Sequence, residues 1–155
     1  MKIKIIAVGK NMPSWITEGF NEYHKRLPAG LLSLHELAPA KLSSLHTPEQ
    51  IKEDEGARLL KLISPKDFVI ALEVKGLSFS TEELSVQLNQ WQLESLEICL
   101  MIGGAEGLSK ACLQRAHKQW SLSALTLPHP LVRVVLIEQL YRAWSILQQH
   151  PYHRA

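Results

Sequence analysis

The chain has little cysteine and no long apolar run. Its two cysteines, Cys99 and Cys112, form no Cys-x-x-Cys pair, so we expect two reduced thiols packed as small hydrophobic side chains rather than a disulfide scaffold. No stretch approaches the roughly 18 apolar residues that a membrane-spanning helix needs. The N-terminal residues lack the apolar segment and cleavage site of a secretory signal. The sequence therefore predicts a cytoplasmic protein that neither crosses a membrane nor depends on disulfides.

The motifs of several common enzyme classes are also absent. There is no Gly-x-Ser-x-Gly nucleophile turn and no Walker A phosphate loop, which argues against a serine hydrolase and against phosphoryl transfer. The glycine segment 103–107 differs from the dinucleotide-binding Gly-x-Gly-x-x-Gly pattern. The pair His150 and His153 has no cysteine or carboxylate nearby, and Pro151 breaks a helical presentation, so we expect no metal site.

What is present indicates one globular domain. The chain has 155 residues, of which 46% are hydrophobic and 21% charged, so residues 1–155 can bury a core of their own. Charge is distributed unevenly. Residues 1–109 contain 11 Lys or Arg against 14 Asp or Glu, whereas residues 110–155 contain six against one, together with four of the seven histidines. Either this is ordinary scatter, or the basic C-terminal part binds an anionic partner such as nucleic acid.

Strand-like and helix-like segments alternate along the chain. The expected strands are Lys2–Val8, Leu31–Leu37, Asp67–Leu72, Glu97–Ile102 and Trp120–Leu127, and the expected helices are 13–27, 47–63, 80–91, 109–118 and 130–149. Residues 38–46 are expected to form a polar connection and Gly76–Ser80 a loop. Such alternation is typical of an α/β fold, with a mostly parallel sheet covered by helices on both faces.

The expected last helix, 130–149, is apolar on nearly every side. Its apolar positions surround the helix axis instead of forming one stripe, and such a helix must be buried all round. Two explanations stay open: it is a central core helix, or a subunit interface covers the face that this chain leaves open. Glu138 and Arg142 are four residues apart on it, so they share a face and can pair. They form either a structural ion pair or a base held by its neighbour.

Three further segments could carry chemistry. The glycine segment 103–107 lies between a strand and a helix, where it is either a plain turn or a place at which backbone approaches a ligand. Residues 122–128 form a strand exit whose backbone groups could bind a nucleoside. The tail from His150 is either disordered, as termini often are, or uses Tyr152 and His153 to stack on a base and bind phosphate.

Four segments resemble the small SPOUT methyltransferases that modify a pseudouridine in 23S ribosomal RNA. They are Ile102–Ser109, Trp120–Arg133, Glu138–Trp144 and His150–Arg154, and the N-terminal segments 7–10 and 12–15 fit as well. The resemblance covers the whole chain, and the order and spacing of several long motifs make it specific. This chain has Ala105 where members of the family often have proline, and nothing is carried over for the variable residues 41–55.

The resemblance implies a fold, a cofactor and partners that the residue patterns alone do not reveal. It implies a trefoil knot in the C-terminal part, an obligate homodimer, S-adenosylmethionine held in the knot and, as substrate, a pseudouridine in helix 69 of 23S rRNA presented by the assembled ribosome. The resemblance places the cofactor beside a leucine at a strand end, two glycines of segment 103–107 and the segment 122–128. The implied cofactor-binding residues are Leu72, Gly103, Gly104, Leu122, Ser123, Ala124, Leu125, Thr126, Leu127 and Pro128.

The candidate catalytic residues lie in the basic C-terminal part. Methyl transfer from a sulfonium is an in-line displacement, and the N3 proton of pseudouridine must leave at or before attack. Our first candidate for the base is His153 and the second is Glu138, while Tyr152 is expected to stack on the target base. Arg142 is expected beside the reacting groups. The expected RNA phosphate contacts are Arg133, Arg142 and Arg154.

Two competing hypotheses stay open at this point. A non-catalytic RNA- or ribosome-binding dimer would share the basic tail and the apolar last helix, but it would bind no cofactor and would not need the glycine segment. A nucleotide-binding α/β enzyme of another type would bind NAD or ATP. The sequence argues against the latter because both standard phosphate-binding fingerprints are missing.

Overall fold

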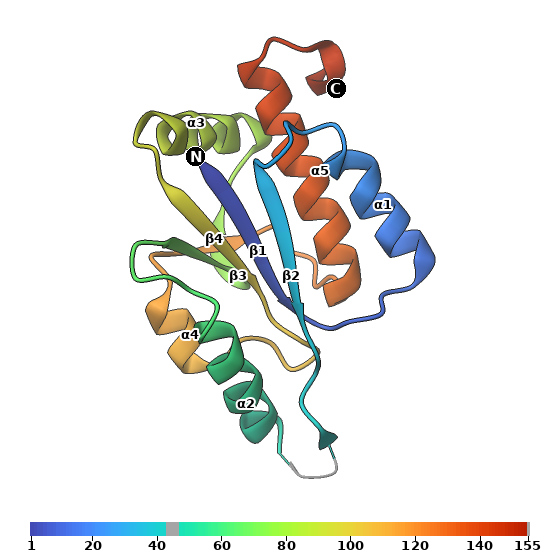
Figure 1. The fold of residues 1–155 in the computed structure, drawn as a ribbon, viewed down its shortest axis with the longest axis vertical. Helices are drawn as coiled ribbons and strands as arrows, with labels where there is room; N and C mark the ends of the chain where they lie inside the picture. The colour runs from blue at the N-terminus through green and yellow to red at the C-terminus, as the bar shows by residue number, and fades with distance from the viewer. Residues whose placement is uncertain (43–46, 155) are drawn as a thin grey trace.

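A five-stranded parallel sheet forms the centre of the computed structural model, which describes residues 1–42 and 47–154 (Figure 1). The strands are β1 (Lys2–Val8), β2 (Leu32–Leu37), β3 (Phe68–Ser78), β4 (Glu97–Ile102) and β5 (Lys118–Ser121). Their order across the sheet is β2-β1-β4-β3-β5, and every neighbouring pair is parallel. The expected α/β class is thereby confirmed. The expected polar connection 38–46 lies partly outside the described residues.

Helices cover both faces of the sheet. They are α1 (Ser14–His24), α2 (Pro48–Leu60), α3 (Thr81–Leu93), α4 (Lys110–Arg115), α5 (His129–Leu147) and the 3-10 turn η2 (Pro151–His153). α5 packs against α1 and α3 on one face, and α2 packs against α4 on the other (Figure 1). Within residues 1–42 and 47–154, no helix is both long and apolar enough to span a membrane.

Alternating residues of the central strands fill two apolar layers. On β1, Ile3, Ile5 and Ala7 join the layer beneath α1, α3 and α5, whereas Ile6 and Val8 join the layer beneath α2 and α4. All five side chains are at most 2% exposed. A strand that is buried on both faces needs apolar residues in both sets, and this burial is the main driving force for the fold.

The two cysteines are free thiols in the layer beneath α2 and α4, as the sequence predicts. Burial raises the pKa of the Cys99 thiol to about 12 and also raises the pKa of Cys112. A thiol that stays protonated is a poor nucleophile. Both cysteines therefore act as small core residues.

Side-chain caps fix where two helices begin. The Thr47 hydroxyl accepts the N–H of Gln50 at 3.1 Å, and the Gln50 side chain accepts the N–H of Thr47 at 3.2 Å. Ser80 and Glu83 form the same capping box at the start of α3, with distances of 3.0 and 3.1 Å. The sequence predicts both boxes, and each of the five α-helices begins within one residue of its predicted start.

The end of β3 differs from the sequence prediction. The strand continues to Ser78, through residues that were expected to form a loop. A Cβ atom on Gly76 would lie 2.6 Å from the backbone carbonyl carbon of Gln119, so only glycine lets the two backbones come this close. The register shifts between Leu72 and Leu77, and β3 then pairs again with β5. Gly76 therefore permits the close approach of β3 to β5 and does not begin the loop that the sequence predicts.

Residues 122–128 also differ, because they form a loop where an extended strand was expected. The Ser121 hydroxyl donates to the carbonyl oxygen of Ser123 at 2.9 Å, and the Ser123 hydroxyl accepts the N–H of Leu125 at 3.0 Å. Such local side-chain bonds compete with the ladder bonds of a sheet. The chain therefore leaves the sheet after Ser121 and passes to α5.

α5 is buried along one side only within this chain. Leu136, Ile137 and Leu140 are at most 1% exposed, in the layer shared with α1 and α3. Val134 and Val135 remain half-buried. The explanation of α5 as a core helix accounts for Leu136, Ile137 and Leu140. Val134 and Val135 are apolar residues that a subunit interface, the other explanation, would cover.

Candidate functional site

A cavity of about 420 Å³ lies beside the carboxyl end of β4 and the middle of β3, where the register with β5 shifts. Its walls come from residues 72–74 of β3, the glycine segment 103–107, the loop 122–128 and the first turn of α5. Parallel α/β sheets bind ligands at the carboxyl ends of their strands, and the volume is within the range of small-molecule sites. Most lining side chains are apolar: Leu72, Val74, Ile102, Ala105, Leu108, Leu122, Leu125, Leu127 and Val132.

The cavity brings together most of the expected cofactor-binding residues. Those that line it are Leu72, Gly103, Gly104, Leu122, Ser123, Leu125, Leu127 and Pro128. Ala124 and Thr126 are exposed and do not line it. Sequence reasoning missed three polar side chains in the walls, those of Glu73, Trp120 and His129. Glu73 directly follows Leu72, His129 directly follows Pro128, and Trp120 lies two residues before Leu122. The pattern therefore indicated residues near them in the sequence but gave no signal for these three themselves.

The glycine segment is shaped by close backbone contacts. A Cβ atom on Gly103 would lie 2.7 Å from the carbonyl carbon of Gly107, and one on Gly104 would lie 2.8 Å from Glu55 Oε1. The Gly107 N–H donates to the carbonyl oxygen of Gly104 at 3.0 Å, and Gly107 has a φ of 87°. The segment is thus a tight turn that also forms a cavity wall. Both explanations left open by the sequence, a plain turn and a place where backbone can approach a ligand, fit this geometry.

Three buried polar atoms near the cavity have no hydrogen-bond partner among the described residues. They are Glu55 Oε1, Trp120 Nε1 and His129 Nδ1. Burial, and after it the nearby Arg133 cation, lowers the pKa of His129, while Glu55 acts in the opposite direction. The His129 imidazole is therefore neutral at physiological pH. Buried polar atoms are usually paired, so unpaired atoms around a cavity are consistent with a ligand site.

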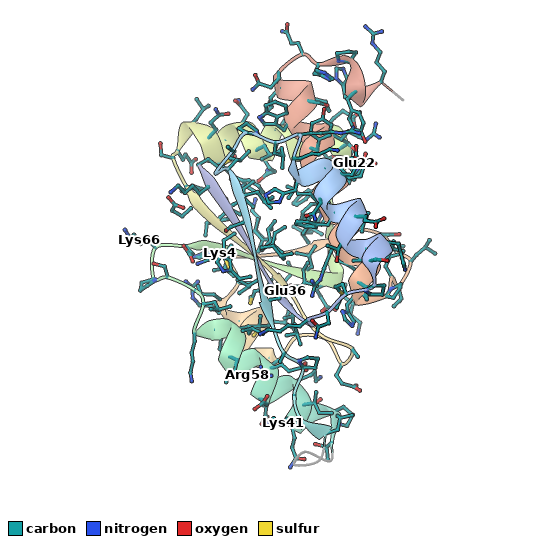
Figure 2. The ribbon with its side chains drawn as sticks, turned by 45° about the vertical axis from the view of Figure 1, so that its right-hand side comes forward. Lys4, Glu22, Glu36, Lys41, Arg58 and Lys66 are labelled. Atoms are coloured by element: carbon teal, nitrogen blue, oxygen red, sulfur yellow. The ribbon has the colours of Figure 1, made fainter. Side chains whose placement is uncertain are left out.

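Arg133 is not available for the phosphate contact that the sequence suggested. Its side chain is 2% exposed. Its guanidinium forms an ion pair with Glu36, whose place on β2 is labelled in Figure 2, and donates to the carbonyl oxygen of Gly9 at 2.9 Å. A buried cation needs such partners, and here they join α5 to the ends of β1 and β2. We therefore correct the expectation and assign Arg133 a structural role.

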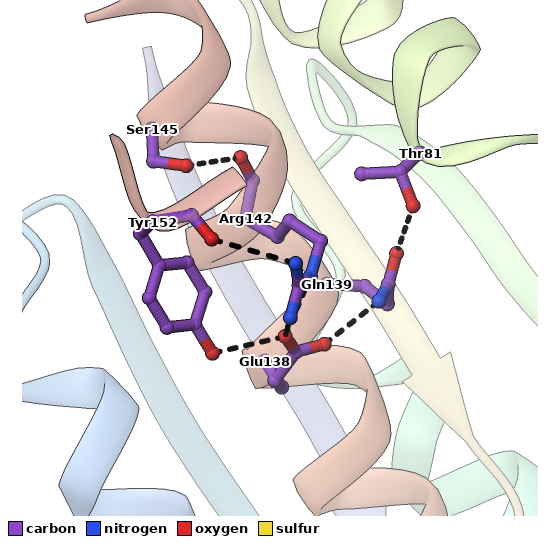
Figure 3. A network of polar contacts seen from close by, with 6 residues as sticks. All are labelled: Thr81, Glu138, Gln139, Arg142, Ser145 and Tyr152. Carbon is purple, nitrogen blue, oxygen red and sulfur yellow. Dashed lines mark hydrogen bonds and ion pairs between the residues drawn. The ribbon is translucent and has the colours of Figure 1, made fainter. Parts of the chain in front are cut away.

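Glu138 is the centre of a polar cluster on α5 (Figure 3). Its Oε1 atom accepts from Arg142 Nε at 2.8 Å and from the Tyr152 hydroxyl at 3.0 Å, and its Oε2 atom accepts from Gln139 at 2.7 Å. The bond with Glu138 raises the pKa of Arg142. Burial, followed by the bonds with Tyr23 and Glu138, raises the pKa of Tyr152. The carboxylate is thus fully engaged, and the structural ion pair is the better description of Glu138 and Arg142.

The C-terminal tail is folded through Arg154. His150 begins the turn η2, where its Nδ1 atom accepts the N–H of Tyr152 at 3.2 Å. The Tyr152 ring packs on Tyr141 with centroids 4.6 Å apart, and the Arg142 guanidinium lies 4.8 Å from its centre. His153 contacts the carbonyl oxygen of His150. Of the two alternatives left open for the tail, disorder does not hold for residues 150–154, and Arg154 is exposed.

The structure separates the tail from the cavity of the same chain. His129, at the start of α5, lines the cavity, whereas η2 follows the far end of this 19-residue helix (Figure 1). At 1.5 Å per residue the helix is about 28 Å long, and Glu138 lies about 14 Å along it. The candidate base His153 and the stacking residue Tyr152 therefore do not reach the cavity that their own chain forms.

Within the described residues, no cluster of His, Cys, Asp or Glu is arranged to hold a metal ion.

Sequence comparison finds relatives that match this chain over almost its whole length. The proteins named ribosomal RNA large subunit methyltransferase H from Hahella chejuensis and Saccharophagus degradans are 52% and 53% identical to this chain over 155 residues. The alignments cover 99% of this chain and 99% and 100% of the two relatives.

Solved structures share the fold at low sequence identity. A probable methylase family protein from Haemophilus influenzae Rd KW20 has a TM-score of 0.61 at 14% identity, and the match covers 99% of this chain and 70% of that one. A probable methyltransferase from Bordetella pertussis Tohama I has a TM-score of 0.55 at 12% identity, with 92% and 95% covered. The family model described as "Predicted SPOUT methyltransferase" matches residues 1–153. The chain belongs to the SPOUT methyltransferase family, whose fold carries the C-terminal trefoil knot expected from the sequence.

Proposed function

We propose that this protein is an S-adenosylmethionine-dependent methyltransferase that methylates N3 of a pseudouridine in helix 69 of 23S rRNA, acting on ribosomes in the cytoplasm. The observation that carries the proposal is the cavity beside β3 and β4, which is lined by eight of the ten residues expected to bind the cofactor. Membership of the SPOUT family and the names of the relatives, which are rRNA methyltransferases, support it.

The cavity has the properties that the cofactor requires. A Cβ atom on Gly103 or Gly104 would clash with other atoms of the chain within 3 Å, so only glycine lets this segment form the tight backbone wall of the cavity. The loop 122–128 offers backbone groups and apolar side chains to an adenosine. When bound, S-adenosylmethionine supplies a methyl group on a sulfonium. Leu72, the two glycines and the loop would hold it.

We propose further that the enzyme acts as a homodimer in which the tail of one subunit completes the cavity of the other. About 22 Å of helix, from Val132 in the cavity wall to Leu147, separates the tail from its own cavity, yet the tail holds the candidate base. The half-buried Val134 and Val135 on α5 offer apolar surface for an interface. Leu125, which lines the cavity and is 72% exposed, offers more at its mouth.

Within such a composite site each residue of the tail and of α5 would have a separate role. His153 would accept the N3 proton, since imidazole is the most common general base in enzymes and the alternative, Glu138, is held by Arg142 and Tyr152. Tyr152 would stack on the target base. Arg154, which is exposed, would contact phosphate, and Arg142 would hold Glu138 while its remaining N–H groups face the RNA.

The test is methyl transfer from labelled S-adenosylmethionine to ribosomes that lack this modification, followed by mapping of the labelled nucleotide. Label at a helix 69 pseudouridine is the expected result. Ribosome binding without any transfer would favour the non-catalytic binding module instead. Label at another nucleotide would keep the enzyme and the cofactor but overturn the proposed substrate.

A further inference from the structure

The electrostatics of the cavity are dominated by one carboxylate in its wall. Among the described residues that line it, Glu73 is the only carboxylate, and none is Lys or Arg. Glu73 directly follows Leu72 on β3 and is half-buried. The rest of the lining is mainly apolar. Water screens a charge less effectively in such surroundings, so this carboxylate acts strongly on a charged ligand.

A second carboxylate lies directly behind the glycine wall. Glu55 of α2 is 4% exposed, its Oε2 atom accepts the N–H of Ala40 at 3.0 Å, and its Oε1 atom has no partner among the described residues. That free oxygen is 2.8 Å from the position of a Cβ atom on Gly104. With glycine there, no side chain stands between the carboxylate and the backbone that forms the cavity wall.

The cations near the cavity are held by other acidic groups. Arg133 is paired with Glu36 on the far side of the Gly9 backbone. Lys52 is paired with Glu49 at 2.8 Å, and its ammonium also interacts with Glu106 and Glu73. His129 is neutral because burial and Arg133 lower its pKa. The surroundings of the cavity are therefore net negative.

We propose that Glu73, with Glu55 behind the wall, makes the cavity selective for the positive charge that the cofactor carries before methyl transfer and lacks afterwards. The inference rests on the proposed function. Transfer forms the N3–methyl bond and breaks the sulfur–methyl bond, whose electron pair stays on sulfur, while the N3 proton goes to the base. The sulfonium becomes a neutral thioether, so the two carboxylates attract S-adenosylmethionine more strongly than S-adenosylhomocysteine and favour exchange of product for fresh cofactor.

Titration calorimetry with each ligand tests this in the full-length protein without RNA. Glu73→Gln keeps the shape and removes the charge. We expect it to weaken S-adenosylmethionine binding by about tenfold and S-adenosylhomocysteine binding by less than about twofold. Glu55→Gln should act in the same direction, and its carbonyl oxygen can still accept from Ala40. The control is Glu82→Gln, an exposed carboxylate on α3, which should change neither affinity.

The pattern of the two affinities decides the outcome. An equal loss for both ligands from Glu73→Gln would mean contact with a part that they share, such as the amino group, and would overturn the inference. No loss for either would overturn it as well. If Glu55→Gln does not fold, Glu73→Gln alone decides. If the wild-type protein binds neither ligand, the proposed function itself fails, and that result is distinguishable from the other two.

Discussion

The Arg133 guanidinium, on the first turns of α5, donates to the carbonyl oxygen of Gly9 at the end of β1, at a distance of 2.9 Å. The same guanidinium pairs with Glu36 on β2. One buried side chain thus joins α5 to the carboxyl ends of two strands, one turn away from His129 in the cavity wall. Arg133 thus positions the first turn of α5 in the cavity wall, and its own side chain does not line the cavity.

Replacing Arg133 should destabilise the fold more than it changes chemistry. Arg133→Ala leaves the Gly9 carbonyl without its donor and Glu36 without its cation, so we expect the free energy of unfolding to fall by about 3 kcal/mol. Urea unfolding measures this. Lys25→Ala, which removes an exposed pair with Glu22, is the control and should leave the midpoint nearly unchanged. Equal small shifts in both variants would contradict the structural role.

Gly104→Ala should impair cofactor binding specifically. The new methyl group would lie 2.8 Å from Glu55 Oε1 and 3.1 Å from Val8 Cγ1, so the wall must shift. We expect the affinity for S-adenosylmethionine to fall by about tenfold or more, which corresponds to about 1.4 kcal/mol. Gly19→Ala is the matched control, because its methyl group would meet Val134 at an ordinary 3.4 Å. Unchanged affinity in Gly104→Ala would mean that the glycine segment is only a turn.

The pH dependence of stability should report on His129. Folding lowers its pKa below the ordinary value of 6.5, so the unfolded chain takes up the proton first as the pH falls. The contribution of neutral His129 to the free energy of unfolding is therefore complete above about pH 6.5, and it is lost as the pH falls through the lower pKa of the folded state. Urea midpoints at about pH 7.5 and about pH 5.5 should therefore differ more in the wild type than in His129→Gln. A ring resonance of His129 that titrates above 6.5 by NMR would contradict the lowered pKa.

The sequence predicts the layers better than the site. Periodic apolar residues predict the strands because burial on both faces leaves a strong signal, as in Ile3 to Val8. Gly76 was misleading because a glycine needed for close strand approach looks the same as one in a turn. The burial of Arg133 and the roles of Glu55 and Glu73 depend on contacts between distant segments, which periodicity does not report.

His153 should be required for turnover if it is the base. We expect His153→Ala to lower the rate of methyl transfer by about 100-fold or more, with the affinity for S-adenosylmethionine unchanged, because the proposed role of His153 is to accept the N3 proton of the target base and not to hold the cofactor. Glu138→Gln tests the second candidate. Near-normal turnover in His153→Ala, measured under single-turnover conditions, would remove the assignment and leave Glu138 as the base.

Mixed dimers test whether a tail serves the cavity of the other subunit. His153→Ala damages the tail and leaves the cavity intact. Gly103→Val damages the cavity, since even a Cβ atom there would lie 2.7 Å from the Gly107 backbone, and leaves the tail intact. If the composite site is correct, a mixed dimer has one cavity and one tail that are both intact and that meet in the same site. Random assortment makes half of the dimers mixed, so co-expression should restore about a quarter of wild-type activity, although each variant alone is inactive. If each tail served its own subunit's cavity, every site in the mixed dimer would contain a defect, and co-expression would restore nothing.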